Sequence, residues 1–344
     1  MEARLGRWIE KAVDGKTVLS GGARITGPQG SVFAGAGGLE ADTPFFIASC
    51  TKLLTAALSF RLAEAGTLSL DGRLADLIDP ALLHGLHTLK GVDRAAEITL
   101  RHLLSHQSGL PDYFQGRGPD ERTLLAKLSA GEDQGWTGPE AVAMSKAMRP
   151  HFPPGAGRRA LYSDTNYQLL GLALEAASGL PYSALIEREL FAPLGLRQTA
   201  LSPGPPGAPA PLPFYSKGRP LAIPAAMASF GPDGGVVSTV DEATQLLQAF
   251  FEGALFDPAF LEGAQRWRPL FFPLEYGEGL MRYRLPRLMT GFRAMPALIG
   301  HAGLSGSFMF FAPQTQTYLV GTLNQIDRPG RTFQLLTRLA LLRP

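Results

Sequence analysis

The stretch Ser49-Cys50-Thr51-Lys52 places a serine and a lysine three residues apart, where the apolar run Pro44–Ala48 passes into a helical pattern. Leucines recur at helical spacing beyond it and Gly66 supplies a stop signal, which predicts a core helix from Thr51 to Ala65. If Ser49 begins that helix, both side chains share one face and the ammonium can point at the hydroxyl. A serine hydroxyl needs such help to act as a nucleophile. The spacing also occurs by chance on solvated helices, so its meaning depends on what accompanies it.

The composition indicates a large folded protein without a charged binding surface. With 344 residues, 45% of them hydrophobic and 18% charged, the chain can bury a large core in one domain or two interlocked ones. Its 32 basic and 30 acidic residues leave a net charge of +2 and form no basic stripe, which argues against nucleic acid as a partner. The single cysteine, Cys50, excludes an internal disulfide and is expected to be a buried small hydrophobe.

The N-terminal segment, residues 1–11, carries charges throughout and lacks the apolar core of a signal peptide. It is therefore expected to form an amphipathic helix. Nowhere does the chain approach the roughly 18 consecutive apolar residues of a membrane span. If Met1 is the native start, we expect a cytoplasmic protein.

Strand patterns lie toward both ends of the chain and helical patterns toward its middle. Residues 23–35 alternate around the turn Gly27-Pro28-Gln29-Gly30, and residues 307–312 and 317–323 flank another turn, so each pair predicts a hairpin. Short strands are expected beyond Gly231, and a last helix over 332–342. The pattern predicts an α+β fold, with one antiparallel sheet built from both ends, flanked by helices and carrying a helical insertion.

A second chemical cluster follows the turn Phe152-Pro153-Pro154-Gly155. The segment Leu161-Tyr162-Ser163-Asp164-Thr165-Asn166-Tyr167 groups hydroxyl, carboxylate and amide side chains ahead of an apolar helix expected to start near Gln168. Tyr162 can serve as a base or proton shuttle if a nearby ammonium lowers its pKa from about 10. Alternatively, the polar residues cap the helix and the tyrosines belong to the core.

A third cluster is Gly300-His301-Ala302-Gly303-Leu304-Ser305-Gly306, at the entrance to the predicted strand 307–312. Glycines at a strand edge allow close approach of a ligand, and a backbone amide there can donate to an oxyanion. His301 would add a polar contact. The alternative is a bulged edge strand with a surface histidine.

Taken in order, Ser-x-x-Lys, Tyr-Ser-Asp and His-x-Gly resemble the motifs of the serine β-lactamase and penicillin-binding-protein superfamily. Within it, the chain is most similar to class C β-lactamase-related esterases and peptidases, such as family VIII carboxylesterases. Two further segments, 98–110 and 234–239, resemble framework segments of that family, so the likeness runs from about residue 20 to about residue 325. It implies a β-lactamase/transpeptidase-like fold. Residues 1–70 and 225–344 would carry the sheet, residues 71–224 would be mostly helical, and the active site would lie at their interface.

The resemblance also implies roles for single residues. Ser49 would be the acylated nucleophile, and Lys52 and Tyr162 would share the general-base and proton-return work, in an order that the sequence leaves open. The backbone amides of Ser49 and Leu304 would form the oxyanion hole beside Gly303. His301 would contact the substrate, and Asp164 would stand beside Lys52.

Two of these positions depart from the family pattern. His301 stands where lactamases and penicillin-binding proteins place a lysine that helps hold the substrate carboxylate. Asp164 stands where asparagine is commoner, and an ionised carboxylate cannot donate a hydrogen bond to a substrate carbonyl. Both departures favour an ester over a β-lactam, so we expect a carboxylesterase that forms an acyl-enzyme, with an amidase, D-amino-acid peptidase or weak β-lactamase as the alternative.

Other classes fit the sequence less well. His102 and His106 are four residues apart but lack the glutamate of a zinc-protease motif, so we expect no metal, and the chemistry calls for no organic cofactor. A catalytically silent member that uses the fold for binding is a remote alternative, because all three motifs retain reactive residue types. The expected partner is a small-molecule ester or amide, and the oligomeric state is not readable from the sequence.

Overall fold

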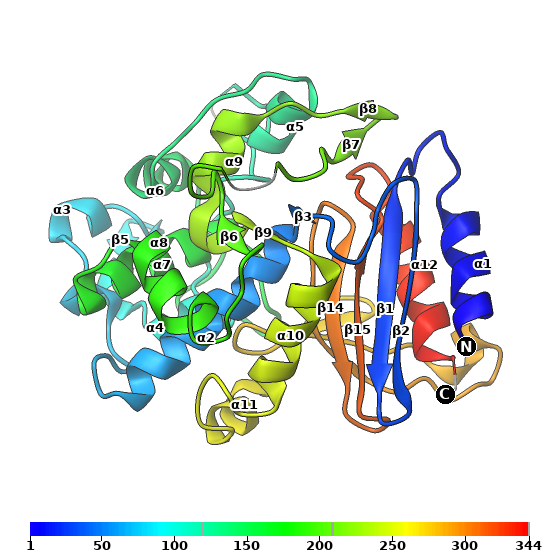
Figure 1. Cartoon of the computed structure of the whole chain (residues 1–344). Coiled ribbons are helices and arrows are strands. Elements are labelled where there is room, and N and C mark those ends of the chain that lie inside the picture. The colour runs from blue at the N-terminus through cyan, green and yellow to red at the C-terminus, as the bar shows by residue number, and fades with distance from the viewer. Residues whose placement is uncertain (119, 208–209, 343–344) are drawn as a thin grey trace.

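A large antiparallel sheet joins the two ends of the chain. The computed structural model describes residues 1–118, 120–207 and 210–342. Within them, eight strands form one sheet in the order β10-β11-β12-β13-β14-β15-β1-β2 (Figure 1). The strands are β1 (Gly21–Gly27), β2 (Gly30–Ala36), β10 (Arg268–Phe271), β11 (Leu274–Tyr276), β12 (Met281–Tyr283), β13 (Leu298–Ala302), β14 (Ser307–Ala312) and β15 (Thr317–Thr322). The β1–β15 pair, in register at Ile25 and Leu319, closes the sheet across almost the whole sequence.

Both predicted hairpins are present in this sheet. β1 and β2 pair across the turn after Gly27, and β14 and β15 pair across residues 313–316. Every residue of β14 is buried, because successive side chains point to opposite faces and both faces are covered. Phe308 and Phe310 enter one apolar cluster, whereas Met309 and Phe311 enter the other.

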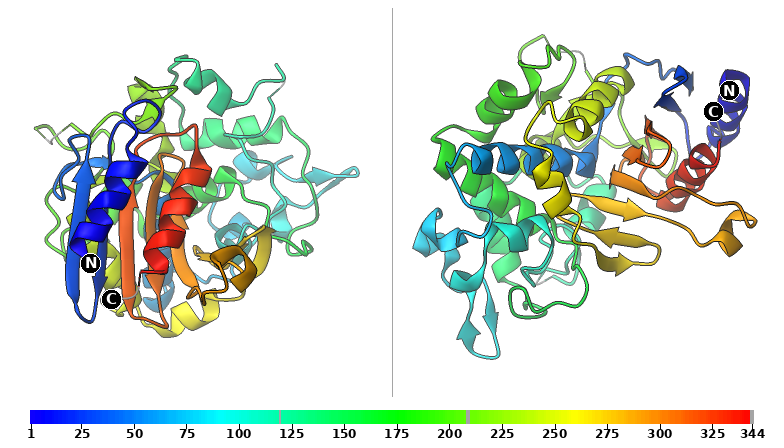
Figure 2. Two further views of the ribbon diagram at one scale, coloured as in Figure 1. Left: turned by 90° about the vertical axis from the view of Figure 1, so that its right-hand side faces the viewer. Right: turned by 90° about the horizontal axis from the view of Figure 1, so that it is seen from below.

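Helices cover the two faces of the sheet. On the outer face, α1 (Glu2–Ala12) and α12 (Pro329–Ala340) lie side by side, near both chain ends (Figures 1 and 2). Leu5, Ile9 and Leu336 of these helices join the cluster of Phe308 and Phe310. On the inner face, α10 (Val240–Phe251) contacts β14 and β15, and α2 (Thr51–Glu64) contacts β13. The α+β class and the flanking helices are therefore confirmed.

The helix α2 runs through the middle of the molecule. Eleven of its fourteen residues are buried, as expected for a helix that is not amphipathic and packs on all sides. It begins one element after β3 (Phe45–Phe46), which belongs to a small sheet in the order β3-β9-β6 with β9 (Val236–Ser238) and β6 (Ala200–Leu201). The apolar run before Ser49 is thereby paired to a strand almost two hundred residues away.

The helical side of the molecule is built from short elements. Its helices are α3 (Pro80–Leu83), α4 (Leu100–Leu104), α5 (Leu124–Ser129), α6 (Gly138–Lys146), α7 (Asp164–Ser178), α8 (Tyr182–Ile186) and α9 (Pro224–Phe230), with short turns η2 (Leu74–Asp76), η3 (Ala95–Glu97), η4 (Glu187–Phe191) and η5 (Gly231–Asp233). Two small hairpins, β4 (Thr88–Leu89) with β5 (Val92–Asp93) and β7 (Tyr215–Ser216) with β8 (Arg219–Pro220), project from it. The exact division into 1–70 with 225–344 and 71–224 stays a prediction.

Three boundaries differ from the sequence-based expectation. The helix expected near Gln168 begins at Asp164, so the polar cluster lies in its first turn. The region beyond Gly231, expected to hold short strands, also contains α10 and α11 (Ala259–Ala264). A local interaction stabilises the start of α10: the side chain of Thr239 caps the helix by accepting a hydrogen bond from the backbone N–H of Glu242 at 3.1 Å. The last helix starts at Pro329, three residues earlier than expected, since proline fits the first helical turn.

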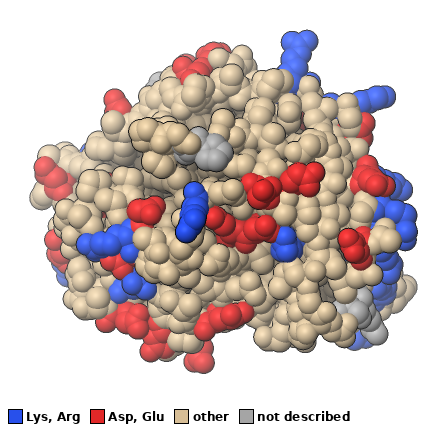
Figure 3. Space-filling model, viewed as in Figure 1, with Lys and Arg blue, Asp and Glu red and all other residues tan. Residues whose placement is uncertain are grey.

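The outer surface carries charges of both signs. Figure 3 shows Lys and Arg side chains interspersed with Asp and Glu side chains on the face it views. Among the described residues, no single helix is long and apolar enough to cross a membrane; one pair, Asp164–Ser178 with Tyr182–Phe191, meets the length and composition test only jointly and is bent by 77°.

Candidate active site

Ser49 lies in the turn η1 (Ala48–Cys50) that leads directly into α2. Ala48 adopts a φ of +46°, a conformation that costs energy in a non-glycine residue and is typical of functional turns. The turn is held from both sides, because the N–H of Ile47 donates to the carbonyl of Val236 at 3.0 Å and the buried Cys50 thiol donates to the carbonyl of His301 at 3.3 Å. Ser49 itself is half-buried, so a ligand can reach its hydroxyl.

Lys52 is fully buried, and its ammonium makes two hydrogen bonds and one ion pair. Its Nζ lies 3.3 Å from Ser49 Oγ, 2.5 Å from the carbonyl oxygen of Asp233 and 2.6 Å from Asp164 Oδ1. Burial alone would lower the pKa of Lys52, but its neighbours, above all the Asp164 carboxylate, outweigh burial and raise the pKa. Lys52 is therefore a cation in the resting site.

Tyr162 stands immediately before α7, with its ring beside Lys52. The Nζ of Lys52 is 5.1 Å from the centre of the Tyr162 ring. The centre of the His106 ring is 4.4 Å from the centre of the same tyrosine ring. The hydroxyl is buried and has no hydrogen-bond partner among the described residues. Burial raises the pKa of Tyr162 and outweighs the lowering by nearby Lys52 and Ser49, so the phenol keeps its proton in the resting site.

Two carboxyl groups that sequence reasoning missed lie around Asp164. Asp112 accepts from the backbone N–H of Asp164 at 3.2 Å, and burial followed by the charge of Asp164 raises the pKa of Asp112 to about 8. Asp233 accepts from the hydroxyl of Tyr113 at 2.8 Å, and the same two causes raise its pKa well above the usual range. Their only sequence signal is proximity to framework segments, since Asp112 follows 98–110 and Asp233 precedes 234–239.

His301 lies inside the molecule, next to the tyrosines of the site. It is fully buried in β13, with Nε2 3.1 Å from the hydroxyl of Tyr276 and Nδ1 2.8 Å from the carbonyl of Ala302. Burial and the charge of Lys52 lower the pKa of His301 to about 3, so the ring is neutral. Because the ring lies behind Tyr162 and is absent from the cavity wall, a direct contact with substrate does not follow from its position. The alternative of a surface histidine is wrong, because the side chain is fully buried; the role of His301 toward substrate stays a prediction.

The loop after His301 approaches η1 closely. At Gly303, a Cβ atom would come within 2.3 Å of Ser307 Oγ and 2.7 Å of the Ile47 carbonyl, so only glycine fits. Leu304 lines the cavity beside Ser49, and its backbone N–H makes no backbone hydrogen bond within the described part of the chain. The first N–H groups of a helix are likewise without intrahelical acceptors. The two amides expected to form the oxyanion hole thus border one cavity.

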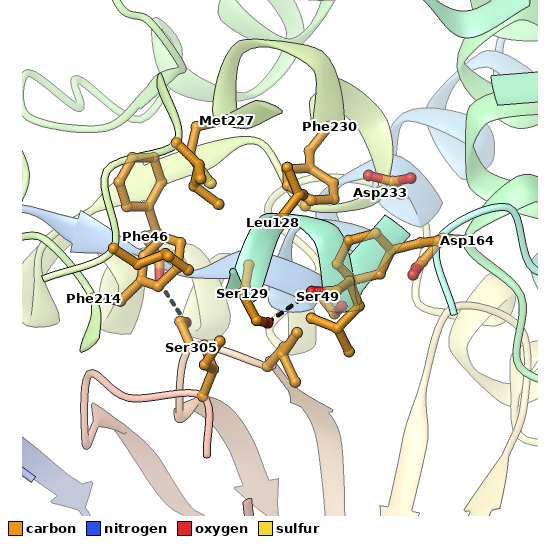
Figure 4. A pocket seen from close by; sticks show the side chains of 18 residues that line it. Phe46, Ser49, Leu128, Ser129, Asp164, Phe214, Met227, Phe230, Asp233 and Ser305 are labelled. Atoms are coloured by element: carbon orange, nitrogen blue, oxygen red, sulfur yellow. Dashed lines mark hydrogen bonds between the residues drawn. The ribbon is translucent and has the colours of Figure 1, made fainter. Parts of the chain in front are cut away.

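The cavity beside Ser49 has an apolar wall and an acidic edge (Figure 4). It encloses about 60 Å³. Asp164 and Asp233 line it together with Ser49, Ser129 and Ser305. The apolar wall consists of Phe46, Phe114, Leu125, Leu128, Phe214, Leu221, Ile223, Met227, Phe230, Leu304 and Ile326.

The two histidines considered as metal ligands do not converge. His102 Nδ1 accepts from the backbone of Thr99 at 3.3 Å at the start of α4, whereas His106 Nδ1 lies 2.9 Å from the amide of Asn166. Within the ranges that the structure describes, no group of three or more His, Cys, Asp or Glu residues is arranged to hold a metal ion.

Comparison with known proteins identifies the family of this chain and supports its fold. A family model described as Beta-lactamase matches residues 5–342, and the chain therefore belongs to the β-lactamase family.

Similar proteins differ in the reactions that their names describe. The D-alanyl-D-alanine-carboxypeptidase/endopeptidase AmpH of Escherichia coli (strain K12) is 32% identical over 48% of this chain and 39% of its own length. The monacolin J acid methylbutanoyltransferase of Aspergillus terreus is 30% identical over 46% of this chain and 38% of its own. The matched segments thus span well under half of these relatives. Among solved structures, D-amino acid amidase from Ochrobactrum anthropi SV3 superposes with a TM-score of 0.78 at 24% identity, covering 97% of this chain and 98% of that one.

Proposed function

We propose that this chain is a carboxylesterase that hydrolyses small-molecule esters through an acyl-enzyme on Ser49. The observation that carries this proposal is the kind of side chain that lines the cavity. Its described lining residues include two carboxyl groups and no lysine, arginine or histidine. A β-lactam or a peptide C-terminus brings a carboxylate, and this lining offers no cationic side chain to pair with it. An ester with an apolar acyl group needs no such partner.

The proposed attack uses the buried ion pair as its proton acceptor. Ser49 Oγ bonds to the ester carbonyl carbon while its proton passes to Lys52, which hands one of its own protons to Asp164. The 2.6 Å contact between Lys52 and Asp164 and the 3.3 Å contact between Lys52 and Ser49 support this path. The negative charge on the carbonyl oxygen is stabilised by the N–H groups of Ser49 and Leu304.

Tyr162 returns the proton in this scheme. Its phenol, which keeps its proton in the resting site, donates that proton to the alcohol oxygen as the bond between this oxygen and the carbonyl carbon breaks. Lys52 then gives a proton to the phenolate and recovers one from Asp164, which restores the ion pair. Water then attacks the acyl-enzyme with the same groups acting in reverse, so that Ser49 regains its proton and the acid is released. Which of Lys52 and Tyr162 accepts first stays a prediction, as does a cytoplasmic location.

An amidase or peptidase on the same site is the second candidate. AmpH, which is similar over about half of this chain, is named a carboxypeptidase and endopeptidase, and the methylbutanoyltransferase is named for acyl transfer. Hydrolysis of an amide and transfer of an acyl group both begin with attack by a nucleophile on a carbonyl group. The reaction that an enzyme favours therefore depends on which leaving group and which acyl group its site accepts.

Parallel assays on p-nitrophenyl acetate and butyrate, a chromogenic cephalosporin and D-amino-acid amides test the proposal. We expect the esters to give the highest kcat/KM, and Ser49→Ala to lower ester turnover at least about a thousandfold. Intact-mass measurement after rapid quenching should find the acyl adduct on the wild type and none on Ser49→Ala. Ester turnover that survives in folded Ser49→Ala would contradict the proposal, and a cephalosporin rate above the ester rate would favour a lactamase.

A further inference from the structure

Two neighbouring turns next to strands β10 to β13 carry most of the exposed apolar side chains. In the part of the chain that the structure describes, seven large apolar residues are exposed, and five of them fall between residues 271 and 292. These five, which we call the apolar patch, are Phe271 (58% exposed), Phe272 (66%), Leu288 (74%), Met289 (57%) and Phe292 (77%). Single exposed apolar residues are ordinary, but a group of them on one surface usually marks contact with a partner.

The two turns that carry the apolar patch border one hollow. The first turn joins β10 to β11 and carries Phe271 and Phe272, and the second runs through η6 (Arg287–Thr290) between β12 and β13. Phe272 and Arg287 both line the hollow, which has a volume of about 640 Å³. The apolar patch is therefore one surface with two protruding tips.

The second turn holds its phenyl ring outward at a conformational cost. Phe292 has a φ of +62°, a left-handed conformation that a bulky residue rarely adopts. Its backbone N–H donates to the carbonyl of Arg287 at 2.7 Å. The hydroxyl of the buried Thr290 lies 3.0 Å from the same carbonyl and 2.5 Å from the carbonyl of Arg293. Strain that is fixed in this way clusters at sites that bind a ligand or a partner.

Positive charge surrounds the apolar patch. Segment 284–294 contains three arginines, all exposed, and no acidic residue. The hollow between the turns is also lined by three arginines, and the one carboxylate among its described lining residues, Glu275, is paired with Arg282 at 2.7 Å. Acidic residues elsewhere reduce the net charge of the chain to +2, so its composition gave no sign of this local excess.

We propose that the apolar patch docks on the surface of an anionic phospholipid bilayer. Its five side chains enter the boundary between headgroups and acyl chains, and the guanidinium groups of Arg284 and Arg287 pair with lipid phosphates. This inference does not depend on the proposed esterase activity, because none of these residues lines the cavity beside Ser49.

Charge and shape favour a bilayer over a second copy of the chain. In a dimer with two-fold symmetry the patch would face itself, and the arginines of one copy would oppose those of the other. Two tips separated by a hollow also offer little complementary surface to a folded protein, whereas fluid acyl chains can surround each tip.

Co-sedimentation of the full chain with vesicles tests the proposal. The vesicles consist of phosphatidylcholine alone or of phosphatidylcholine with about 30% phosphatidylglycerol, which is anionic. We expect the partition constant to be at least about tenfold higher on the anionic vesicles, since each arginine near such a surface contributes about fivefold. This preference should weaken as NaCl is raised from about 0.05 M to about 0.5 M, because salt screens the attraction.

Variants separate the apolar contribution from the charged one. Phe292→Ser should lower the partition constant on anionic vesicles at least about tenfold, because an inserted phenyl ring is lost. Arg284→Gln/Arg287→Gln should bring the constant close to the value on phosphatidylcholine.

Matched controls remove similar groups from other surfaces. Val92→Ser removes an apolar side chain that is 48% exposed on the hairpin of β4 and β5. Arg188→Gln/Arg197→Gln removes two exposed arginines from the helical side of the molecule. Both controls should keep the wild-type partition constant.

Several results would overturn the proposal: no binding, equal binding to both kinds of vesicle, or unchanged binding by Phe292→Ser. Sedimentation velocity without lipid tests self-association, and a dimer that Phe292→Ser dissociates would assign the patch to a second copy instead. If circular dichroism shows that Phe292→Ser is unfolded, Phe292→Trp takes its place. More quenching of its fluorescence by brominated lipid than in the wild type supports insertion, and equal quenching refutes it.

Discussion

Replacement of Asp164 by asparagine tests the central electrostatic feature of the site. The contact between Lys52 Nζ and Asp164 Oδ1 is 2.6 Å long, and both side chains are almost completely buried. At an effective dielectric constant of about 20, two charges at this distance attract by about 6 kcal/mol. Breaking a buried pair by removing one partner typically costs about 3–5 kcal/mol. Burial raises the pKa of Asp112 and of Asp233, and ionisation of either carboxyl group in the variant would recover part of this cost, so we expect a loss of about 3 kcal/mol.

Urea unfolding followed by circular dichroism measures this loss. Asp241→Asn is the control, because Asp241 pairs with Arg24 at the surface and is half-exposed; it should cost less than about 1 kcal/mol. The double variant Asp164→Asn/Asp233→Asn should lose more than the two single variants together, since the reserve carboxyl group is gone. If Asp164→Asn costs no more than the control, the ion pair contributes little to stability and the reasoning fails.

The same variant tests the proposed proton path. Without Asp164, Lys52 cannot hand its proton on, and ester kcat/KM should fall by about a hundredfold, within the usual range for loss of an acid–base group. A folded Asp164→Asn variant with wild-type turnover and an unchanged pH profile would exclude Asp164 as the acceptor.

Two further variants probe the surrounding groups. Tyr162→Phe removes a hydroxyl without a partner among the described residues, so we expect stability within about 0.5 kcal/mol of the wild type and turnover reduced nearly as far as in Ser49→Ala; near-normal turnover would remove Tyr162 from the mechanism. His301→Gln tests a pH effect. Burial lowers the pKa of His301 to about 3, below the roughly 6.5 of an unfolded histidine, so the unfolded chain binds more protons between these values. The contribution of neutral His301 to stability is therefore complete above about pH 6.5 and is lost as the pH falls toward 3. Unfolding free energies at pH 7 and pH 5 should show the wild type losing more than His301→Gln over this interval, and equal losses would refute the assignment.

Much of the fold was readable because its signals are local. The hairpins at residues 21–36 and 307–322 follow from alternating side chains around turn residues, and α2 follows from leucines at helical spacing. The capping pattern of Thr239 with Glu242 was equally local and would have identified α10. The pairing of β1 with β15 was inferred only in outline, because register across almost three hundred residues has no local signal.

The candidate site likewise contains residues that local sequence signals predict and residues that only the fold brings together. Ser49 and Lys52 are three residues apart, so helix geometry alone brings their side chains to 3.3 Å. Tyr162 and Leu304 were assigned through the family resemblance, since nothing in their own segments indicates that they meet Ser49. Asp112 and Asp233 were missed because each, taken locally, is an acidic residue next to a proline or a glycine.

The sequence by itself determined the pairing of Ser49 with Lys52, the α+β class and the family. Only the tertiary structure decided the charge and exposure of each group. It buries His301 behind Tyr162, and it gathers three carboxyl groups from separate segments around Lys52. The physical reason is that helical or strand spacing depends on neighbours within a few residues, whereas the pKa and accessibility of a side chain depend on whatever distant segments the fold packs against it.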